Sequence, residues 1–222
     1  MIVSPYSMIS TRLLTCSVIT SYIIYCVNYN GLSLSMRHPA NAISSFAYAA
    51  YQTDRGVQLP LFVLSVASFN LWSQDNSYIN FVDVTSIFWT IVVVTLNTIK
   101  DNRLVIYAVD GFFILYIAVV FGTGAQARVV EYYSENLIQL NAIIYLLCAV
   151  VGASLHRGSK HYLIGSLCIT TGFACKLLTI LANQYWGTCL FHLLSAAGIG
   201  RMLQINMHDS SDVKYLSFDS VV

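Results

Sequence analysis

Three polar side chains of the kinds that enzymes use in catalysis stand inside apolar stretches of this chain. They are Ser68 in SVASFNLW, Asp83 in SYINFVDVTSIFW and His192 in CLFHLLSAAG. A hydroxyl, a carboxylate and an imidazole can attack a carbonyl, transfer a proton or hold a metal ion. Ionisable groups inside membrane helices are costly and usually functional. The three residues therefore predict one site for hydrolytic, metal or lipid chemistry.

The elements that must position these residues are membrane helices. The 222-residue chain is 57% hydrophobic and 9% charged, against roughly 25% charged residues in a soluble domain. Its formal net charge of +1 excludes a basic nucleic-acid-binding surface. Apolar runs approach the length of about 20 residues that spans a bilayer at 11–28, 39–53, 59–74, 79–99, 103–122, 136–155, 161–182 and 187–206.

We expect an all-α, polytopic transmembrane bundle in three parts. Residues 1–30 form a signal anchor helix or a cleaved signal peptide, and both readings stay open. Residues 31–206 form a seven-helix membrane domain, with 122–136 as its longest outer loop. Residues 207–222 form a disordered tail. Basic residues concentrate in alternate connections and in the tail, which predicts a cytoplasmic C-terminus and a multi-pass protein of the endoplasmic reticulum, Golgi or plasma membrane.

The depth of the polar residues predicts which of them meet. At about 1.5 Å per residue, Ser68, Asp83 and His192 each lie roughly five residues from the outer end of their helix. Lys176, at about six residues, reaches the same layer, where it would pair with Asp83; alternatively its amine extends to the membrane surface. Asp110 lies on the inner side, with no partner apparent from the sequence.

The order and spacing of these residues resemble the alkaline ceramidases and the wider CREST superfamily of seven-helix membrane hydrolases. Ser68 precedes Asp83 by fifteen residues, and FHLLSAAG opens the last helix. HPANAISSF is similar to the N-x-x-S-N element of that family, with Asn41, Ser44 and Ser45 at its positions.

The resemblance implies a lipid amide hydrolase acting on ceramide-like substrates. In that family a serine, an aspartate and three histidines build a zinc site. Ser68 and Asp83 match, and His192 matches the second histidine of the closing H-x-x-x-H. Trp72 and Thr188 stand where the other two histidines are expected.

Two arrangements could follow from this partial match. Cys189 is three residues before His192 and on the same helix face, so His192, Asp83 and Cys189 could ligate zinc. In the other arrangement no metal binds, and hydrogen bonds join Ser68, Asp83, Lys176 and His192, with Thr188 as a further candidate partner of the imidazole. The chain's cysteines are otherwise interpreted as packing thiols; they are Cys16, Cys26, Cys148, Cys168, Cys175 and Cys189.

Three function classes follow: a ceramidase-like lipid amidase, a catalytically inactive relative that binds lipids or a partner, and an unrelated seven-helix receptor or transporter. The expected partners are membrane lipids, including sphingolipids, and no nucleic acid. The tail adds two short patterns that also occur by chance. The segment 215–218 has the form of a tyrosine sorting signal for an adaptor, and the segment 219–222 suits a PDZ groove.

Overall fold

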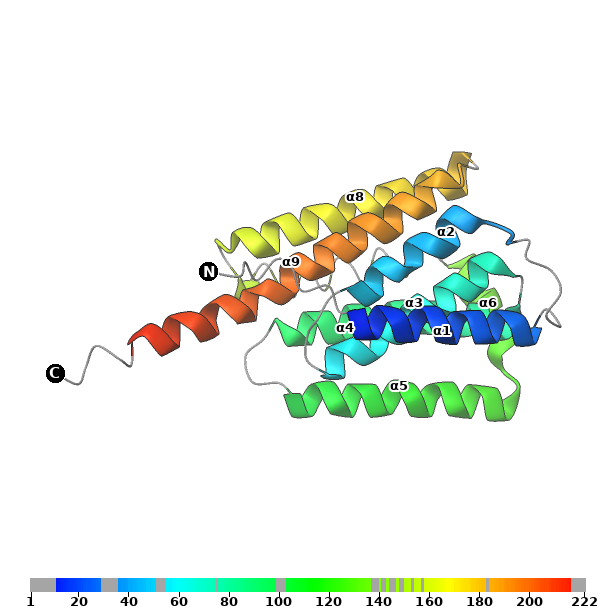
Figure 1. Cartoon of the computed structure of the whole chain (residues 1–222), viewed down its shortest axis with the longest axis horizontal. Helices are drawn as coiled ribbons and strands as arrows, with labels where there is room; N and C mark the ends of the chain where they lie inside the picture. The colour runs from blue at the N-terminus through cyan, green and yellow to red at the C-terminus, as the bar shows by residue number, and fades with distance from the viewer. Residues whose placement is uncertain are drawn as a thin grey trace.

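The computed structural model describes residues 11–28, 36–50, 55–74, 76–98, 103–136, 158–182 and 184–216, with scattered positions between 140 and 156. All the regular structure in these residues is helical (Figure 1). The α-helices are α1 (Thr11–Asn28), α2 (Pro39–Ser44), α3 (Arg55–Ser73), α4 (Ser77–Asn97), α5 (Arg103–Thr123), α6 (Gln126–Glu135), α8 (Lys160–Ala182) and α9 (Trp186–Leu216), and a 3-10 helix, η2 (Ser45–Ala50), follows α2.

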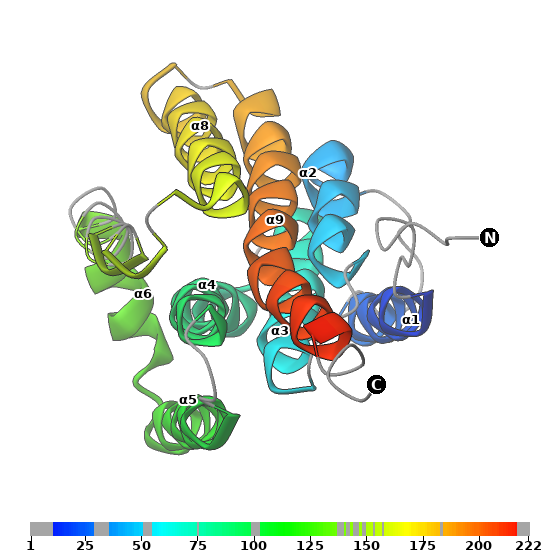
Figure 2. The ribbon, with the colours of Figure 1, turned by 90° about the vertical axis from the view of Figure 1, so that its left-hand side faces the viewer.

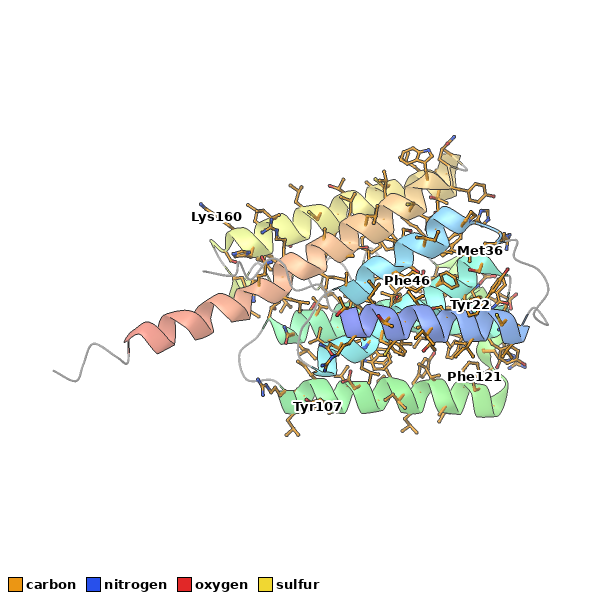
Figure 3. All side chains as sticks on the ribbon, in the orientation of Figure 1. Tyr22, Met36, Phe46, Tyr107, Phe121 and Lys160 are labelled. Atoms are coloured by element: carbon orange, nitrogen blue, oxygen red, sulfur yellow. The ribbon has the colours of Figure 1, made fainter. Side chains whose placement is uncertain are left out.

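Four helices in the described part of the chain are long and apolar enough to cross a membrane: Gly56–Ser73, Ser77–Asn97, Arg103–Thr123 and Lys160–Thr179. The helix α5 carries large apolar side chains outward, with Leu104 82% and Leu115 63% exposed. Tyr107 and Phe121 lie near its two ends (Figure 3). An apolar surface of this extent suits contact with lipid, so the chain is a helical membrane protein. The seven-helix core and the signal anchor remain predictions.

The helix α3 lies at the centre of the bundle and packs against α1, α2, η2, α4 and α5. The helices α8 and α9 run side by side as a hairpin, and α9 also contacts α2, η2 and α4 (Figure 2). The main core cluster joins these layers and includes Leu61, Trp89 and Leu203. Trp89 also donates a 2.8 Å hydrogen bond to Asp110 of α5, which supplies the partner that the sequence did not.

Antiparallel neighbours bring the polar residues to one end of the bundle. Ser68 is near the C-terminal end of α3 and Asp83 near the N-terminal end of α4. Lys176 is near the C-terminal end of α8, and His192 follows the start of α9. Two backbone hydrogen bonds join the start of α2 to α3 at this end, because the amides of Arg37 and His38 donate to carbonyls in the last turn of α3.

The structure differs from the prediction in three segments. The run 39–53 is not one helix: α2 becomes a 3-10 helix at Ser45, where the Ser44 and Ser45 hydroxyls donate to backbone carbonyls three residues earlier. Part of the expected loop 122–136 forms α6. The helix α9 continues to Leu216, within the tail that we expected to be disordered, because neither Gly nor Pro interrupts 201–216.

Several predictions fall on positions that the structure does not describe. The first ten residues of the signal segment, most of the run 136–155 and Cys148 lie outside the described residues. So do residues 217–222, and with them the PDZ pattern and half of the sorting pattern. The other five cysteines are free thiols.

Candidate functional site

His192 joins three helical elements through its imidazole. Its Nδ1 lies 3.1 Å from the backbone oxygen of Asn41 and 2.9 Å from the Ser44 hydroxyl, and its Nε2 lies 3.4 Å from the Ser68 hydroxyl. A carbonyl oxygen only accepts, so Nδ1 carries the proton. In the neutral ring, Nε2 then presents its lone pair to Ser68. The side chain is 3% exposed, which makes this geometry a fixed feature of the interior.

Ser68 connects the imidazole to Asp83. Its hydroxyl also lies within hydrogen-bonding reach of the Asp83 side chain, and its single proton is donated either to Asp83 or to Nε2. Asp83 is 6% exposed, and among the described residues its Oδ1 has no hydrogen-bond partner. A buried carboxylate in this state needs a nearby positive charge.

Lys176 supplies that positive charge. Its ammonium nitrogen lies 5.1 Å from the centre of the Trp72 ring and 5.5 Å from that of Phe191, and it interacts electrostatically with Asp83. The amine therefore points into the bundle rather than to the membrane surface. We call Ser68, Asp83, Lys176 and His192 the polar layer.

Thr188 and Cys189 lie outside the contacts of the polar layer. The Thr188 hydroxyl donates to Thr179 of α8 at 3.1 Å, and the ring nitrogens of His192 contact Asn41, Ser44 and Ser68, so the alternative in which Thr188 bonds the imidazole is not what the structure shows. Cys189 is a partly buried free thiol. In the described part of the chain no three His, Cys, Asp or Glu side chains are close enough to hold a metal ion, and a zinc site on His192, Asp83 and Cys189 stays a prediction.

The residues of the polar layer do not fit the zinc site that the resemblance implies. Catalytic zinc normally takes three protein ligands and a water, whereas His192 and Asp83 supply two donors. Trp72 stands at one expected histidine position and donates no lone pair. Lys176 adds a positive charge beside the remaining donors.

An aromatic cluster covers the polar layer at the end of the bundle. The His38 ring stacks on Tyr185 at 4.5 Å and meets the edge of Trp72 at 5.7 Å. Burial, and then the charge of Arg37, lower the pKa of His38, so the neutral imidazole is favoured there. Trp72 thus separates His38, at the molecular surface, from the Lys176 ammonium.

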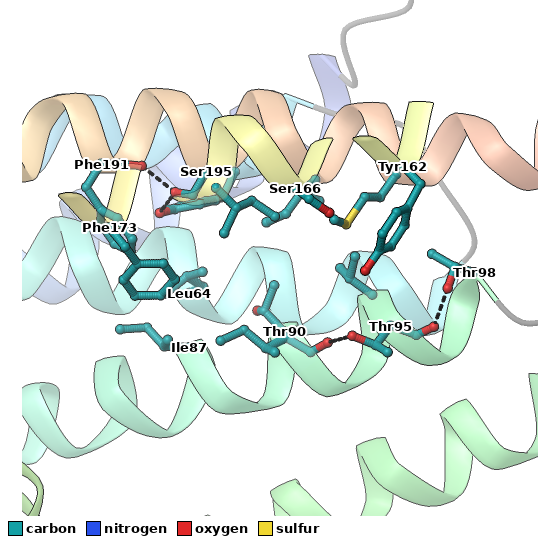
Figure 4. A pocket seen from close by; sticks show the side chains of 16 residues that line it. Leu64, Ile87, Thr90, Thr95, Thr98, Tyr162, Ser166, Phe173, Phe191 and Ser195 are labelled. Carbon is teal, nitrogen blue, oxygen red and sulfur yellow. Dashed lines mark hydrogen bonds between the residues drawn. The ribbon is translucent and has the colours of Figure 1, made fainter. Parts of the chain in front are cut away.

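A partly open apolar pocket adjoins the polar layer on its other side. It lies between α4 and the α8–α9 hairpin (Figure 4). Tyr48, Phe191 and Ser195 line it next to the layer: the Tyr48 ring packs against His192 at 5.8 Å, and the Tyr48 and Ser195 hydroxyls bond at 2.7 Å. The pocket reaches Thr98 and Tyr162 at its far end.

One hydroxyl in this pocket has no partner. Thr90 lines the pocket and is 2% exposed, yet its Oγ1 makes no hydrogen bond in the described structure. By contrast, the hydroxyls of Thr95, on the same helix, and of Thr98, the residue that follows this helix, donate to carbonyls of α4. The free hydroxyl gives the apolar pocket one polar point of recognition.

Sequence reasoning missed Tyr48, Ser195 and Thr90. Helical spacing could have found the first two, because Tyr48 follows Ser44 by four residues and Ser195 follows His192 by three. Nothing in the sequence distinguishes Thr90 from the other threonines of α4, because what sets it apart is a hydroxyl without a hydrogen-bond partner in the described structure.

Comparison with known proteins adds no relative: no family model, no curated protein and no solved structure matches this chain.

Proposed function

We propose that this chain is a ceramidase-like multi-pass membrane protein that binds a lipid, with the acyl chain in the α4–α8–α9 pocket and the polar end toward the polar layer. The observation that carries the proposal is an apolar pocket in membrane-type helices whose wall contacts His192 and Lys176. A membrane ligand site normally combines such an apolar wall with a few polar groups.

The dimensions of the pocket support an acyl chain as the occupant. Along α4 its lining runs from Ile87 to Thr98, which is roughly 16 Å at the rise of an α-helix. One leaflet of a bilayer is about 15 Å of hydrocarbon. A single lipid chain that entered from the membrane would therefore fill the pocket along its length.

A photoactivatable ceramide analogue in phosphatidylcholine vesicles tests this proposal. We expect it to crosslink to peptides of α4 and α8, and Ile169→Trp, which fills the pocket from α8, to reduce crosslinking at least about tenfold. The matched control is Leu167→Trp, because Leu167 is 64% exposed on the same helix. Equal crosslinking of both variants would contradict the proposal.

A second candidate function, hydrolysis of the lipid amide without a metal, is favoured by the contact of Ser68 with His192. A nucleophile, a base at 3.4 Å and a group that orients the base, here the Asn41 carbonyl, form the arrangement of serine hydrolases. Ser68 would add to the amide carbonyl while Nε2 takes its proton. The amine would leave with that proton, and water would then cleave the acyl-serine ester.

Fatty acid release from ceramide distinguishes the two functions. Hydrolysis predicts release that Ser68→Ala abolishes and Ser73→Ala retains, since the Ser73 hydroxyl bonds only within α3 in the described structure. Lipid crosslinking without release would leave binding as the function.

A further inference from the structure

We propose that the Lys176 ammonium takes the electrostatic place of a metal cation in the polar layer, so that this layer works without a metal. This inference concerns the same residues as the proposed function, but it does not require a lipid to bind. It rests on the disagreement between the zinc site that the sequence resembles and the groups that the fold brings together.

The first step is the charge of Asp83. Its carboxylate is buried at 6% exposure and requires a counter-ion in a membrane interior. Lys176 is the cation whose electrostatic attraction reaches it. The carboxylate that would neutralise a metal therefore already has a cationic side chain in its surroundings.

The second step is that the surroundings suit an ammonium better than a metal. Two aromatic rings, Trp72 and Phe191, lie within 5.5 Å of the Lys176 nitrogen. Ring faces attract organic cations through their quadrupole but offer no lone pair to a metal. Trp72 also occupies one of the expected histidine positions, so a single substitution there removes a ligand and adds a surface for the ammonium.

The third step is that Lys176 opposes the binding of a metal ion. Lys176 also interacts electrostatically with His192, the one histidine that remains of the expected set. A divalent cation on His192 and Asp83 would share the buried layer with this ammonium, in a medium of low dielectric constant where like charges repel strongly. The lysine and the metal are therefore alternatives.

Metal content of the purified full-length protein tests the proposal, beginning with the wild type because it avoids any folding defect. After incubation with zinc and removal of the excess, we expect much less than about one zinc per chain, the stoichiometry of a catalytic site. Near-stoichiometric zinc that is lost in His192→Ala would overturn the proposal.

Two engineered variants test the exclusion itself. Trp72→His restores one expected histidine beside His192 and Asp83 while Lys176 remains, and the double variant adds Lys176→Met. We expect the double variant to bind about one zinc per chain and the single variant to bind far less at the same free zinc. Equal binding by both variants would overturn the role of Lys176. Melting curves select variants that fold, and none of these readouts depends on lipid, so a failure of lipid binding would leave the result intact.

Discussion

At the scale of single residues, His192 links three helical elements through its imidazole. A leucine at this position would fill similar space but would leave the Ser68 hydroxyl without its contact to Nε2 and the Ser44 hydroxyl without its contact to Nδ1. The imidazole bonds to α2 through one nitrogen and to α3 through the other, while its backbone belongs to α9. One side chain therefore fixes the relative positions of three elements.

We predict that His192→Ala lowers the free energy of unfolding by about 2 kcal/mol, because it removes hydrogen bonds and leaves a cavity. The control is Leu193→Ala, whose side chain is 47% exposed and which should change stability little. Thermal melting in detergent measures both. An equal effect of the two substitutions would contradict the connecting role of the imidazole.

Substitution of Thr90 should have the opposite effect on stability. Thr90→Val removes a buried hydroxyl that has no partner, so we expect the lipid-free protein to gain up to about 1 kcal/mol and the crosslinking of the ceramide analogue to fall. Thr95→Val provides the comparison, because its hydroxyl bonds to the Ile91 carbonyl and its loss should destabilise the helix. If both variants lose stability equally, the Thr90 hydroxyl is not free.

At the scale of elements, the α8–α9 hairpin depends on close backbone approach. A Cβ at Gly198 would lie 2.6 Å from the carbonyl oxygen of Gly165, whereas one at Gly111 of α5 would meet nothing within 4 Å. Small residues allow membrane helices to approach in this way. The hairpin in turn sets the distance of Lys176 and His192 from α3 and α4.

Gly198→Ala should therefore destabilise the protein by about 1–3 kcal/mol through overpacking. Gly111→Ala, in an open position of a helix, should be neutral or stabilise by up to about 1 kcal/mol. Unfolding in detergent compares them. Similar melting temperatures for the two variants would show that the hairpin tolerates a wider separation.

The junction of α2, α3 and α9 should respond to pH through His38. Its pKa is lowered in the folded protein, while in the unfolded chain it titrates near about 6.5. The fold then binds protons less readily, so the contribution of His38 is fully present above about pH 6.5 and is lost as the pH falls below that value. We expect the melting temperature to fall slightly from about pH 7.5 to about pH 5, and His38→Phe to abolish this fall. If the variant shows the same fall, other titratable groups cause it.

The sequence predicted where the polar residues lie better than how they bond. Counting along apolar runs placed Ser68, Asp83, Lys176 and His192 at one end of the bundle, because depth in a helix depends only on position. It did not predict that the Asn41 carbonyl orients His192, since that bond depends on how α2 packs against α9. Nor did it predict the break at Ser45 or the helix α6, where local hydrogen bonds and amphipathic packing decide the structure.

At the scale of the whole molecule, the polar layer lies at one end of the helical bundle, next to the apolar pocket. The exposed apolar side chains of α5 and α8 face outward, as expected where lipid is the solvent. The polar groups are gathered inside, where α3, α4, α8 and α9 meet. The proposed lipid binding, hydrolysis and metal exclusion all concern this region.

The basic residues of the chain predict its orientation. A protease-sensitive tag after Val222 should be digested in intact microsomes, which places it in the cytoplasm, and a glycosylation acceptor inserted at Gly124, before α6, should be modified in the lumen. A protected tag together with an unmodified acceptor would reverse the orientation.

A double-mutant cycle tests whether Asp83 and Lys176 balance each other's charge inside the bundle. Unfolding of the wild type, Asp83→Asn, Lys176→Met and the double variant would be measured under the same conditions. We predict that each single variant is destabilised and that the double variant recovers stability, with a coupling energy of about 1–3 kcal/mol. Additive effects, with coupling near zero, would contradict a charge balance between Asp83 and Lys176.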